Sequence, residues 1–226
     1  MNRYILLSEK EWHKKLFKNL KEKFINDEWF LIDSKSDFNL DNVTNINPRK
    51  IFIPHWSHII TATIYNKFEC IVFHMTDLPY GRGGSPLQNL IIRGHKETKI
   101  SAIKVEAGID TGDIYIKKNL SLDGTAKEIL LSATIIIDDM ITEIIQNDLI
   151  PMPQTGEVVE FKRRKPEDGN ILLLNDINLI YDYIRMLDCE GYPKAFIETD
   201  SIKIEFSNAH LESNNNLTAH VRIFKK

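Results

Sequence analysis

Residues 70–113 read CIVFHMTDLPYGRGGSPLQNLIIRGHKETKISAIKVEAGIDTGD, and this stretch decides the fold. A short apolar run ends on His74, and a second run, Ile100–Val105, leads into a Gly-rich turn that carries Asp110 and Asp113. Short apolar runs bounded by Gly and Pro are typical of buried strands. Ligands of open α/β sheets bind at the carboxyl ends of the strands, so His74 and Asp110 mark a candidate site.

A histidine and an aspartate within reach of each other can share general acid–base work, because the carboxylate orients the imidazole and raises its basicity. Strand ends also carry such residues without any chemistry. On spacing alone, catalysis has odds of about one in three, so a further observation is needed to choose between the two interpretations. Asp113 is interpreted as a turn residue that hydrogen-bonds to the backbone.

The first fifty residues predict an α/β arrangement. Three apolar runs indicate strands, and they are Tyr4–Leu7, Glu28–Asp33 and Lys50–Pro54. Between the first two, apolar residues recur at helical spacing from Trp12 to Phe24, with Ser8 and Glu11 as a capping box. Residues 34–50 are polar and turn-rich, so we expect a loop. The pattern predicts a shortened Rossmann-like, mostly parallel sheet that is flanked by helices.

Downstream of the opening stretch, Ser85-Pro86 predicts the start of a helix that runs to Arg93, and Thr125 predicts the start of a longer one that ends near Gln146. Strands are expected at residues 100–105 and 114–116. A helical pattern through Ile177–Leu187 and two short strands around Asp200-Ser201 then predict a small α+β C-terminal appendage. We therefore expect a catalytic core over residues 1–150 and a linker with a small subdomain over residues 151–226. No structure is predicted for the stretch after Leu211.

Composition limits the function classes. The chain has 226 residues with 42% hydrophobic and 27% charged residues, which is typical of a globular protein with a sizeable core. A formal net charge of −3 gives no sign of a broad basic surface for nucleic acid. The N-terminus carries charges too early for a signal peptide. Cys70 and Cys189 lack the spacing of metal ligands. The Ile-rich run near residue 135 contains acidic residues, so it is not expected to span a membrane. A cytoplasmic, non-membrane protein with reduced thiols is expected.

The sequence PHWSH at residues 54–58 contains two histidines. Their spacing does not match the i, i+4 pairing that places two ligands on one helix face, and no third ligand lies nearby in the sequence. No metal is therefore expected here, and a strand-to-helix turn is the favoured interpretation.

Three pieces of the opening stretch, VFH, LPYGRGGSP and GIDTGDI, resemble the folate-dependent formyltransferases in content and order. In that family the strand ends in Asn-x-His, and the Asn donates a hydrogen bond to the formyl oxygen. Val72 occupies the Asn position here, so Thr76, Gln88, Asn89 or a loop amide are the alternative donors. The tail segments RRKPEDG, IYDYIR and YPKAF are similar to those of sugar-nucleotide N-formyltransferases.

The resemblance implies transfer of a formyl group from 10-formyltetrahydrofolate to the amine of a nucleotide-linked amino sugar. A UDP-linked 4-amino-4,6-dideoxy sugar of a pseudaminic-acid-type pathway for surface polysaccharide is the expected acceptor. A homodimer is expected on the same basis, and no nucleic-acid partner. The alternatives are a methionyl-tRNA formyltransferase, against which the short tail and the acidic balance argue, and a non-catalytic relative that binds folate or nucleotide sugar.

The resemblance also assigns roles to residues. His74 and Asp110 are the expected catalytic pair. The residues expected on the folate side are Trp56, Ser57, His58, Ile59, Val105, Ala107, Gly108 and Ile109. The residues expected to contact the acceptor substrate are Thr76, Tyr80, Arg82, Gly83, Gly84, Arg163, Arg164 and Tyr192.

Overall fold

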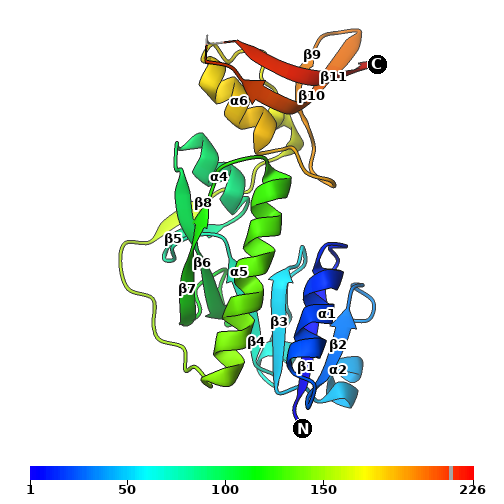
Figure 1. Cartoon of the computed structure of the whole chain (residues 1–226), viewed down its shortest axis with the longest axis vertical. Helices are drawn as coiled ribbons and strands as arrows, with labels where there is room; N and C mark the ends of the chain where they lie inside the picture. The colour runs from blue at the N-terminus through cyan, green and yellow to red at the C-terminus, as the bar shows by residue number, and fades with distance from the viewer. Residues whose placement is uncertain (214–215) are drawn as a thin grey trace. The chain divides into compact units, whose positions relative to one another are not determined.

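The computed structural model describes residues 1–213 and 216–226, which fall into two compact units (Figure 1). Unit 1 comprises residues 1–82, 99–120 and 131–160. Unit 2 comprises residues 83–98, 121–130 and 161–226. The chain thus passes between the units several times. We predicted a division by function at residue 150, whereas these units are defined by packing, so the functional division stays a prediction.

Unit 1 is built on a six-stranded sheet in the order β2-β1-β3-β4-β6-β7. Strands β1 to β4 are parallel neighbours in this order, and β6 is antiparallel to β4. This confirms the predicted α/β fold with a mostly parallel sheet. The strand bounds are β1 (Arg3–Ser8), β2 (Glu28–Ile32), β3 (Lys50–His55), β4 (Cys70–His74), β6 (Glu97–Lys104) and β7 (Ile114–Ser121).

The two faces of this sheet are both apolar because each strand alternates its side chains between two buried layers. On one face Tyr4, Trp29 and Phe52 form an aromatic cluster with ring centroids 5.0–6.0 Å apart. On the other face Ile5 and Ile51 belong to a separate buried cluster. A parallel sheet covered on both faces explains why these strands appear in the sequence as continuous apolar runs.

Helices cover both faces of the sheet in unit 1. Helix α1 (His13–Lys23) lies beside α5 (Ala126–Gln146), where Lys23 Nζ contacts Asp138 Oδ1 at 2.7 Å. The other face carries α3 (Ala62–Tyr65) and α2 (Leu40–Ile46) through Ile64 and Val43.

The helix α2 lies where we expected only a loop, so that prediction is wrong. Asn39 caps this helix, with its side-chain oxygen accepting from the backbone N–H of Asn42 at 2.9 Å. Val43 is fully buried against the sheet. The segment is helical because tertiary packing of this one apolar residue and a good N-cap override its polar composition.

The predicted capping box at Ser8 is also wrong, because α1 begins at His13 with Trp12 as N-cap. Ser8 ends β1 instead, and its hydroxyl lies 2.7 Å from Nδ1 of His13. The next strand in the sheet places His55 opposite Ser8. Two histidines with little access to water therefore lie near the carboxyl ends of β1 and β3.

These two histidines should make the protein less stable in acid. Burial lowers the pKa of His13 to about 3, with His55 and Lys10 adding charge repulsion, and burial lowers the pKa of His55 to about 4. Unfolded histidines take up protons below about 6.5, whereas the folded ones stay neutral until much lower pH. The free energy of unfolding should then fall by about 1.4 kcal/mol per pH unit for each histidine as the pH drops below about 6.

Urea unfolding between pH 7.5 and pH 4.5 measures this loss. The variant His55→Leu should show a shallower dependence of stability on pH than the wild type, because one of the two groups that bind protons only when unfolded is gone. Carboxylates contribute equally to both curves and cancel in the comparison. An unchanged slope would contradict the role assigned to His55.

Unit 2 combines helices with a small antiparallel sheet. Helix α6 (Ile177–Arg185) packs against the sheet β11-β10-β9, and the predicted strands on either side of Asp200-Ser201 are confirmed as β9 (Ala195–Glu198) and β10 (Ile202–Leu211). Strand β11 (Leu217–Lys225) lies in the stretch for which we predicted nothing. The remaining elements of unit 2 are α4 (Pro86–Ile92) and the 3-10 helix η1 (Pro166–Gly169). The strands β5 (Tyr80–Gly83) and β8 (Val159–Phe161) pair with each other, and most of their residues belong to unit 1.

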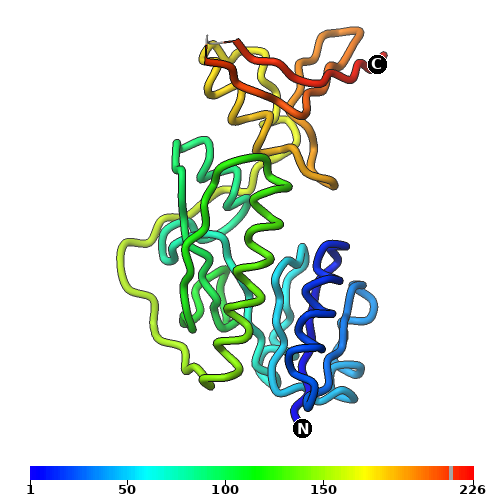
Figure 2. The backbone as a smooth tube through the Cα atoms, in the orientation of Figure 1, coloured from blue at the N-terminus to red at the C-terminus, as the bar shows by residue number. Residues whose placement is uncertain are grey.

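A long connection follows α5 in unit 1. Figure 2 shows it as an extended segment that runs back from the end of the helix. Met152 pairs with Ile114 at the start of β7 through two backbone hydrogen bonds of 2.8 and 2.9 Å. The connection is thereby tied to the strand that follows the Asp110 turn. Across the part of the chain that the structure describes, no helix has the length and apolar character needed to cross a membrane.

Candidate functional site

The site is organised around His74, the last residue of β4. Its side chain is almost fully buried, and Nδ1 lies 3.5 Å from Oδ2 of Asp110. Asp110 lies in the turn between β6 and β7 with a left-handed backbone, φ 54°. The sheet thus brings together two side chains that are far apart in the sequence.

The hydrogen bonds of the imidazole define its tautomer. Nε2 of His74 lies 2.8 Å from the carbonyl oxygen of Gly81. A carbonyl oxygen only accepts, so Nε2 carries a proton and donates it. In the neutral ring Nδ1 is then the unprotonated nitrogen, and it faces the Asp110 carboxylate. The carbonyl of Gly81 orients the ring, while Asp110 stabilises the charge that appears when Nδ1 takes up a proton.

The loop between His74 and Gly81 is held by buried polar groups. The hydroxyl of Ser101 donates to the carbonyl of Thr76 at 2.7 Å and accepts from the backbone N–H of Leu78 at 3.3 Å. The hydroxyl of Thr76 donates to the carbonyl of Gly81 at 3.4 Å. Because every one of these groups is buried and paired, the carbonyl that orients His74 has little freedom to move.

The residues expected on the folate side lie in two loops of unit 1. Trp56, His58 and Ile59 line a small cavity, and its other lining residues are Lys35, Phe38, Thr61 and Ile64. Ile59 is 89% exposed, although it is apolar. The indole Nε1 of Trp56 is buried and has no acceptor among the described residues. A buried donor without a partner and an exposed apolar side chain fit a ring that is both heteroaromatic and polar at its edge, as a pterin is.

The second loop continues from β6 into the Asp110 turn. Val105 packs on the core and its N–H donates to the carbonyl of Cys70 at 2.8 Å. Ile109 is 72% exposed, and Ala107 accepts from the hydroxyl of Thr111 at 2.9 Å. Gly108 is left-handed with φ 103°. The assignment of Ser57 and of these residues to folate stays a prediction.

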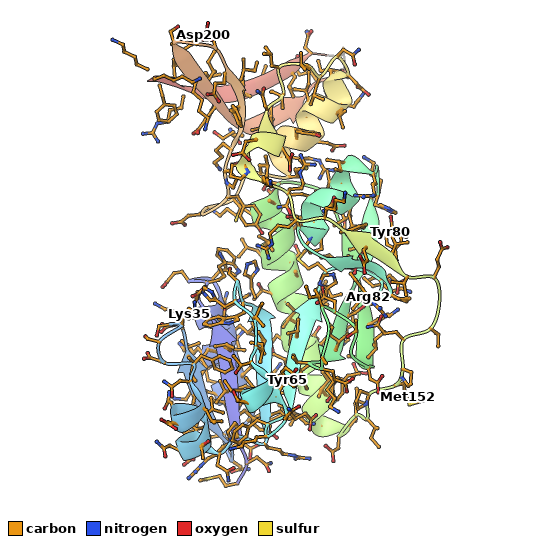
Figure 3. The ribbon with its side chains drawn as sticks, turned by 180° about the vertical axis from the view of Figure 1, so that it is seen from behind. Lys35, Tyr65, Tyr80, Arg82, Met152 and Asp200 are labelled. Carbon is orange, nitrogen blue, oxygen red and sulfur yellow. The ribbon has the colours of Figure 1, made fainter. Side chains whose placement is uncertain are left out.

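Three residues expected to contact the acceptor lie in unit 1. Thr76 is fully buried, and its hydroxyl is engaged with Gly81 as described above. Tyr80 and Arg82 lie on β5, which follows the His74 loop (Figure 3). The guanidinium of Arg82 donates to the side-chain oxygen of Gln154. Arg82 is therefore bound to another side chain of the protein, and its contact with a substrate stays a prediction.

The other residues of the expected acceptor site belong to unit 2. Gly83 and Gly84 leave room for a neighbouring segment, since an added Cβ would lie 2.5 Å from the carbonyl oxygen of Phe161 or from Cβ of Arg163. Tyr192 has its pKa raised by burial, with the nearby Cys189 adding to the effect. Arg164 donates to the carbonyl of Asp168 and lies 5.1 Å from the ring of Tyr183, whereas Arg163 is exposed. Close packing against residues 161 and 163 thus explains why glycine occupies positions 83 and 84. Binding of the acceptor substrate by these residues stays a prediction.

The side chain at the family's Asn position is Val72, two residues before His74 on the same face of β4. Of the alternative donors, Asn89 directs its amide at three backbone carbonyls, those of Gly84, Ser85 and Lys162, at 2.9–3.0 Å. Gln88 donates to the carbonyl of Met186 at 3.3 Å. The side-chain donors of both are thus engaged with the backbone of unit 2, and a loop amide as the replacement donor stays a prediction.

Two residues of this site, Ser101 and Gln154, were not predicted from the sequence. Ser101 appears in the sequence as one polar residue inside an apolar strand, and that interruption is the signal that could have identified it. Gln154 lies between two prolines and a glycine, where composition indicates only a connection. Its contacts with the Asp110 turn come from the path of the chain, and no local pattern indicates them. No group of three or more His, Cys, Asp or Glu residues arranged for a metal occurs within residues 1–213 and 216–226.

Known proteins match this chain in both sequence and structure. The family model for formyl transferases matches residues 14–133, and the model for the C-terminal domain of methionyl-tRNA formyltransferase matches residues 166–224. A solved structure of a methionyl-tRNA formyltransferase from Clostridium thermocellum is 48% identical, covers 100% of both chains and has a TM-score of 0.97. The methionyl-tRNA formyltransferase of Thermodesulfovibrio yellowstonii is 26% identical over 178 residues, which are 75% of this chain and 58% of the relative.

The chain spans about half of the length of the curated relatives that it matches. A sugar N-formyltransferase from Shewanella has a TM-score of 0.68, with 97% of this chain and 96% of that chain covered, but it is only 14% identical. That likeness shows a shared fold and says nothing about a shared substrate.

The expected partners are corrected by these findings. We predicted a nucleotide-linked amino sugar and no nucleic acid, and this is wrong, because the similar proteins with significant sequence identity are methionyl-tRNA formyltransferases. The link to surface polysaccharide has no support for the same reason. Net charge misled the prediction because it sums over the chain and says nothing about local patches. The matched model covers more than half of the sequence, so the chain belongs to the formyl transferase family.

Proposed function

We propose that this protein is a one-carbon transferase that moves the formyl group of 10-formyltetrahydrofolate to the free amino group of an aminoacyl-tRNA, with methionyl-tRNA as the acceptor. The observation that carries the formyl transfer is the pairing of His74 Nδ1 with Asp110 at the carboxyl end of β4. The observation that favours the acceptor is the 48% identity, over the full length of both chains, with a methionyl-tRNA formyltransferase.

When bound, 10-formyltetrahydrofolate supplies the formyl carbon and a leaving nitrogen, so a proton must pass from the attacking amine to that nitrogen. His74 Nδ1 would accept this proton, because Nε2 is already protonated and bound to Gly81. Asp110 offsets the positive charge of the imidazolium while the proton is held there. Burial of the pair strengthens this interaction relative to the same pair in water.

In the two loops expected on the folate side, the exposed Ile59 and Ile109 would offer apolar contact to the cofactor, and the unpartnered N–H of Trp56 would offer a hydrogen bond. These contacts would hold the formyl carbon near His74 and exclude water from it. Exclusion of water matters because a water molecule in place of the amine would release formate.

The experiment is a turnover assay with the purified protein and 10-formyltetrahydrofolate. The acceptors are methionyl-tRNA, uncharged tRNA, free methionine and a panel of UDP- and dTDP-linked 4-amino sugars. Release of tetrahydrofolate is followed by absorbance, and the acylated amino acid is identified by mass after the ester is hydrolysed. We expect turnover with methionyl-tRNA and formation of N-formylmethionine.

Uncharged tRNA controls for binding without transfer, and His74→Asn controls for contaminating enzymes. Turnover with an amino sugar and none with methionyl-tRNA would overturn the acceptor while leaving formyl transfer intact. Formate release at the same rate with and without any acceptor would overturn the transferase activity itself.

A change at Val72 tests the alignment with the family. Residues two apart on a strand face the same side, so an amide at position 72 would lie beside His74. Val72→Asn should keep or raise kcat, because it adds a donor where negative charge develops on the formyl oxygen. Val72→Leu, which adds no donor, is the control. A large loss of kcat in Val72→Asn with unchanged circular dichroism would show that the position is not equivalent to the family's Asn.

A further inference from the structure

The turn that carries Asp110 has a conformation that needs support. Asp110 is left-handed, and a non-glycine residue in that region costs about 1 kcal/mol. The turn is exposed at Ala107 and Ile109, so the packing of its own side chains offers little restraint. Its position nevertheless decides whether the carboxylate faces His74.

Gln154 supplies the support from outside the turn. The side-chain amide nitrogen lies 2.8 Å from the carbonyl oxygen of Asp110 and 2.8 Å from that of Gly112. An amide NH2 group has two hydrogens, so this one group satisfies both carbonyls and joins the two sides of the turn.

Arg82 determines which way this amide faces. Its Nε and Nη2 lie 3.2 and 2.8 Å from the side-chain oxygen of Gln154. A guanidinium can only donate, so the oxygen of Gln154 must face it and the nitrogen must face the turn. The planar fork of Arg82 thus excludes the flipped amide, in which an oxygen would meet two carbonyl oxygens.

The contact between Arg82 and Gln154 connects the backbone that orients His74 with the turn that carries Asp110. Arg82 directly follows Gly81, whose carbonyl orients His74. Gln154 lies close to Met152, which is paired with the strand after the turn. All of these residues belong to unit 1. The path from Gly81 through Arg82 and Gln154 to Asp110 closes a ring of contacts around the imidazole and the carboxylate.

We propose that Arg82 and Gln154 are a positioning pair that sets the distance between His74 Nδ1 and the Asp110 carboxylate. This deepens the proposed formyl transfer and rests on it, and it assigns Arg82 to the support of the site. The step that depends on the pair is proton movement at Nδ1, so kcat should respond and substrate affinity should not.

Gln154→Glu is the sharpest variant because the two side chains have the same shape. Glutamate keeps an oxygen that accepts from Arg82, but it has no hydrogen to donate to Asp110 or Gly112. Arg82→Lys keeps the charge and loses the fork, so it should have an intermediate effect. Asn42→Asp is the matched control, because it makes the same chemical change at an amide that donates to a backbone carbonyl, that of Asp37, elsewhere in unit 1.

We expect Gln154→Glu to lower kcat by about 10-fold to 100-fold with KM for both substrates nearly unchanged, because a shift of about 1 Å in a catalytic group has effects of this size. Nitrogen-15 NMR of labelled histidine adds a readout that does not need turnover. The ring signals of His74, assigned by their loss in His74→Asn, should shift in Gln154→Glu and stay in place in Asn42→Asp.

Wild-type values of kcat and unmoved His74 signals in Gln154→Glu would overturn the proposal. So would a loss of kcat that matches a loss of folded protein, as judged by thermal unfolding beside Asn42→Asp. If the wild-type protein shows no formyl transfer at all, the proposed function fails, and the NMR comparison alone then decides whether the pair positions His74 and Asp110.

Discussion

His74→Asn should lower kcat by about 10³-fold, because general acid–base groups contribute about 10² to 10⁴ to a rate. The variant loses both ring nitrogens, and with them the Nδ1 that can take up a proton and the Nε2 bond to the carbonyl of Gly81. The KM for 10-formyltetrahydrofolate should change little, since the exposed apolar residues expected to bind it lie in other loops. Steady-state kinetics with methionyl-tRNA measure both constants.

Asp110→Asn should lower kcat by about 10²-fold, because it removes the charge that stabilises the imidazolium and keeps the shape of the side chain. The effects of the two substitutions should not add in the double variant, since each removes the same paired unit. Asp113→Asn is the matched control, because this aspartate is in the same turn and its backbone carbonyl accepts from the N–H of Lys104. We expect its kcat to stay within about threefold of the wild type, because the substitution leaves that backbone contact in place. Equal losses in Asp110→Asn and Asp113→Asn would show that the turn matters as a whole and that Asp110 has no special role.

Gly112→Ala should disable the site without touching either catalytic candidate. A Cβ at this buried position would lie 1.8 Å from the carbonyl oxygen of Lys104, which is backbone and cannot rotate away. The turn must therefore move, and with it both Asp110 and the carbonyl of Gly112 that Gln154 holds. We expect a loss of about 10²-fold in kcat and about 1–3 kcal/mol in the free energy of unfolding. Kinetics and urea unfolding of the same preparation measure the two effects.

Gly94→Ala separates the effect of crowding from the effect of losing a glycine. Gly94 has φ 79°, and an added Cβ would meet nothing within 4 Å. The strain of a left-handed alanine should cost about 1 kcal/mol of stability and leave kcat unchanged. If Gly112→Ala kept full activity, the backbone at Lys104 would have to yield without moving Asp110, and the argument for a rigid turn would fail.

The fold follows from local patterns to a large extent. The strands around Ile5, Ile51 and Ile71 appear as short apolar runs because both faces of a parallel sheet are buried, and the helix through residues 126–146 has a long apolar pattern and a start signal at Thr125. The two wrong predictions of secondary structure have a common cause. The helix around Val43 and the start of α1 depend on what those segments pack against, and propensity over a few residues contains no such information.

Part of the candidate site could likewise be predicted from the sequence and part could not. His74 and Asp110 were identified from sequence because each follows a strand and because the surrounding motifs resemble a known family. The acceptor was misjudged because the tail segments RRKPEDG, IYDYIR and YPKAF were interpreted as similar to those of sugar enzymes, and because the charge and length of the whole chain were counted against tRNA. Neither property reports which surface a partner contacts.

The sequence by itself determined the α/β class and the family and proposed the two residues at the centre of the candidate site, because these depend on apolar periodicity and on short motifs. Only the tertiary structure decided that Gly81 orients the imidazole, that Nδ1 faces Asp110, and that Gln154 and Arg82 hold the turn. The physical reason is that hydrogen bonds between segments distant in sequence depend on the path of the chain through the fold, and the residues that make them carry no local pattern.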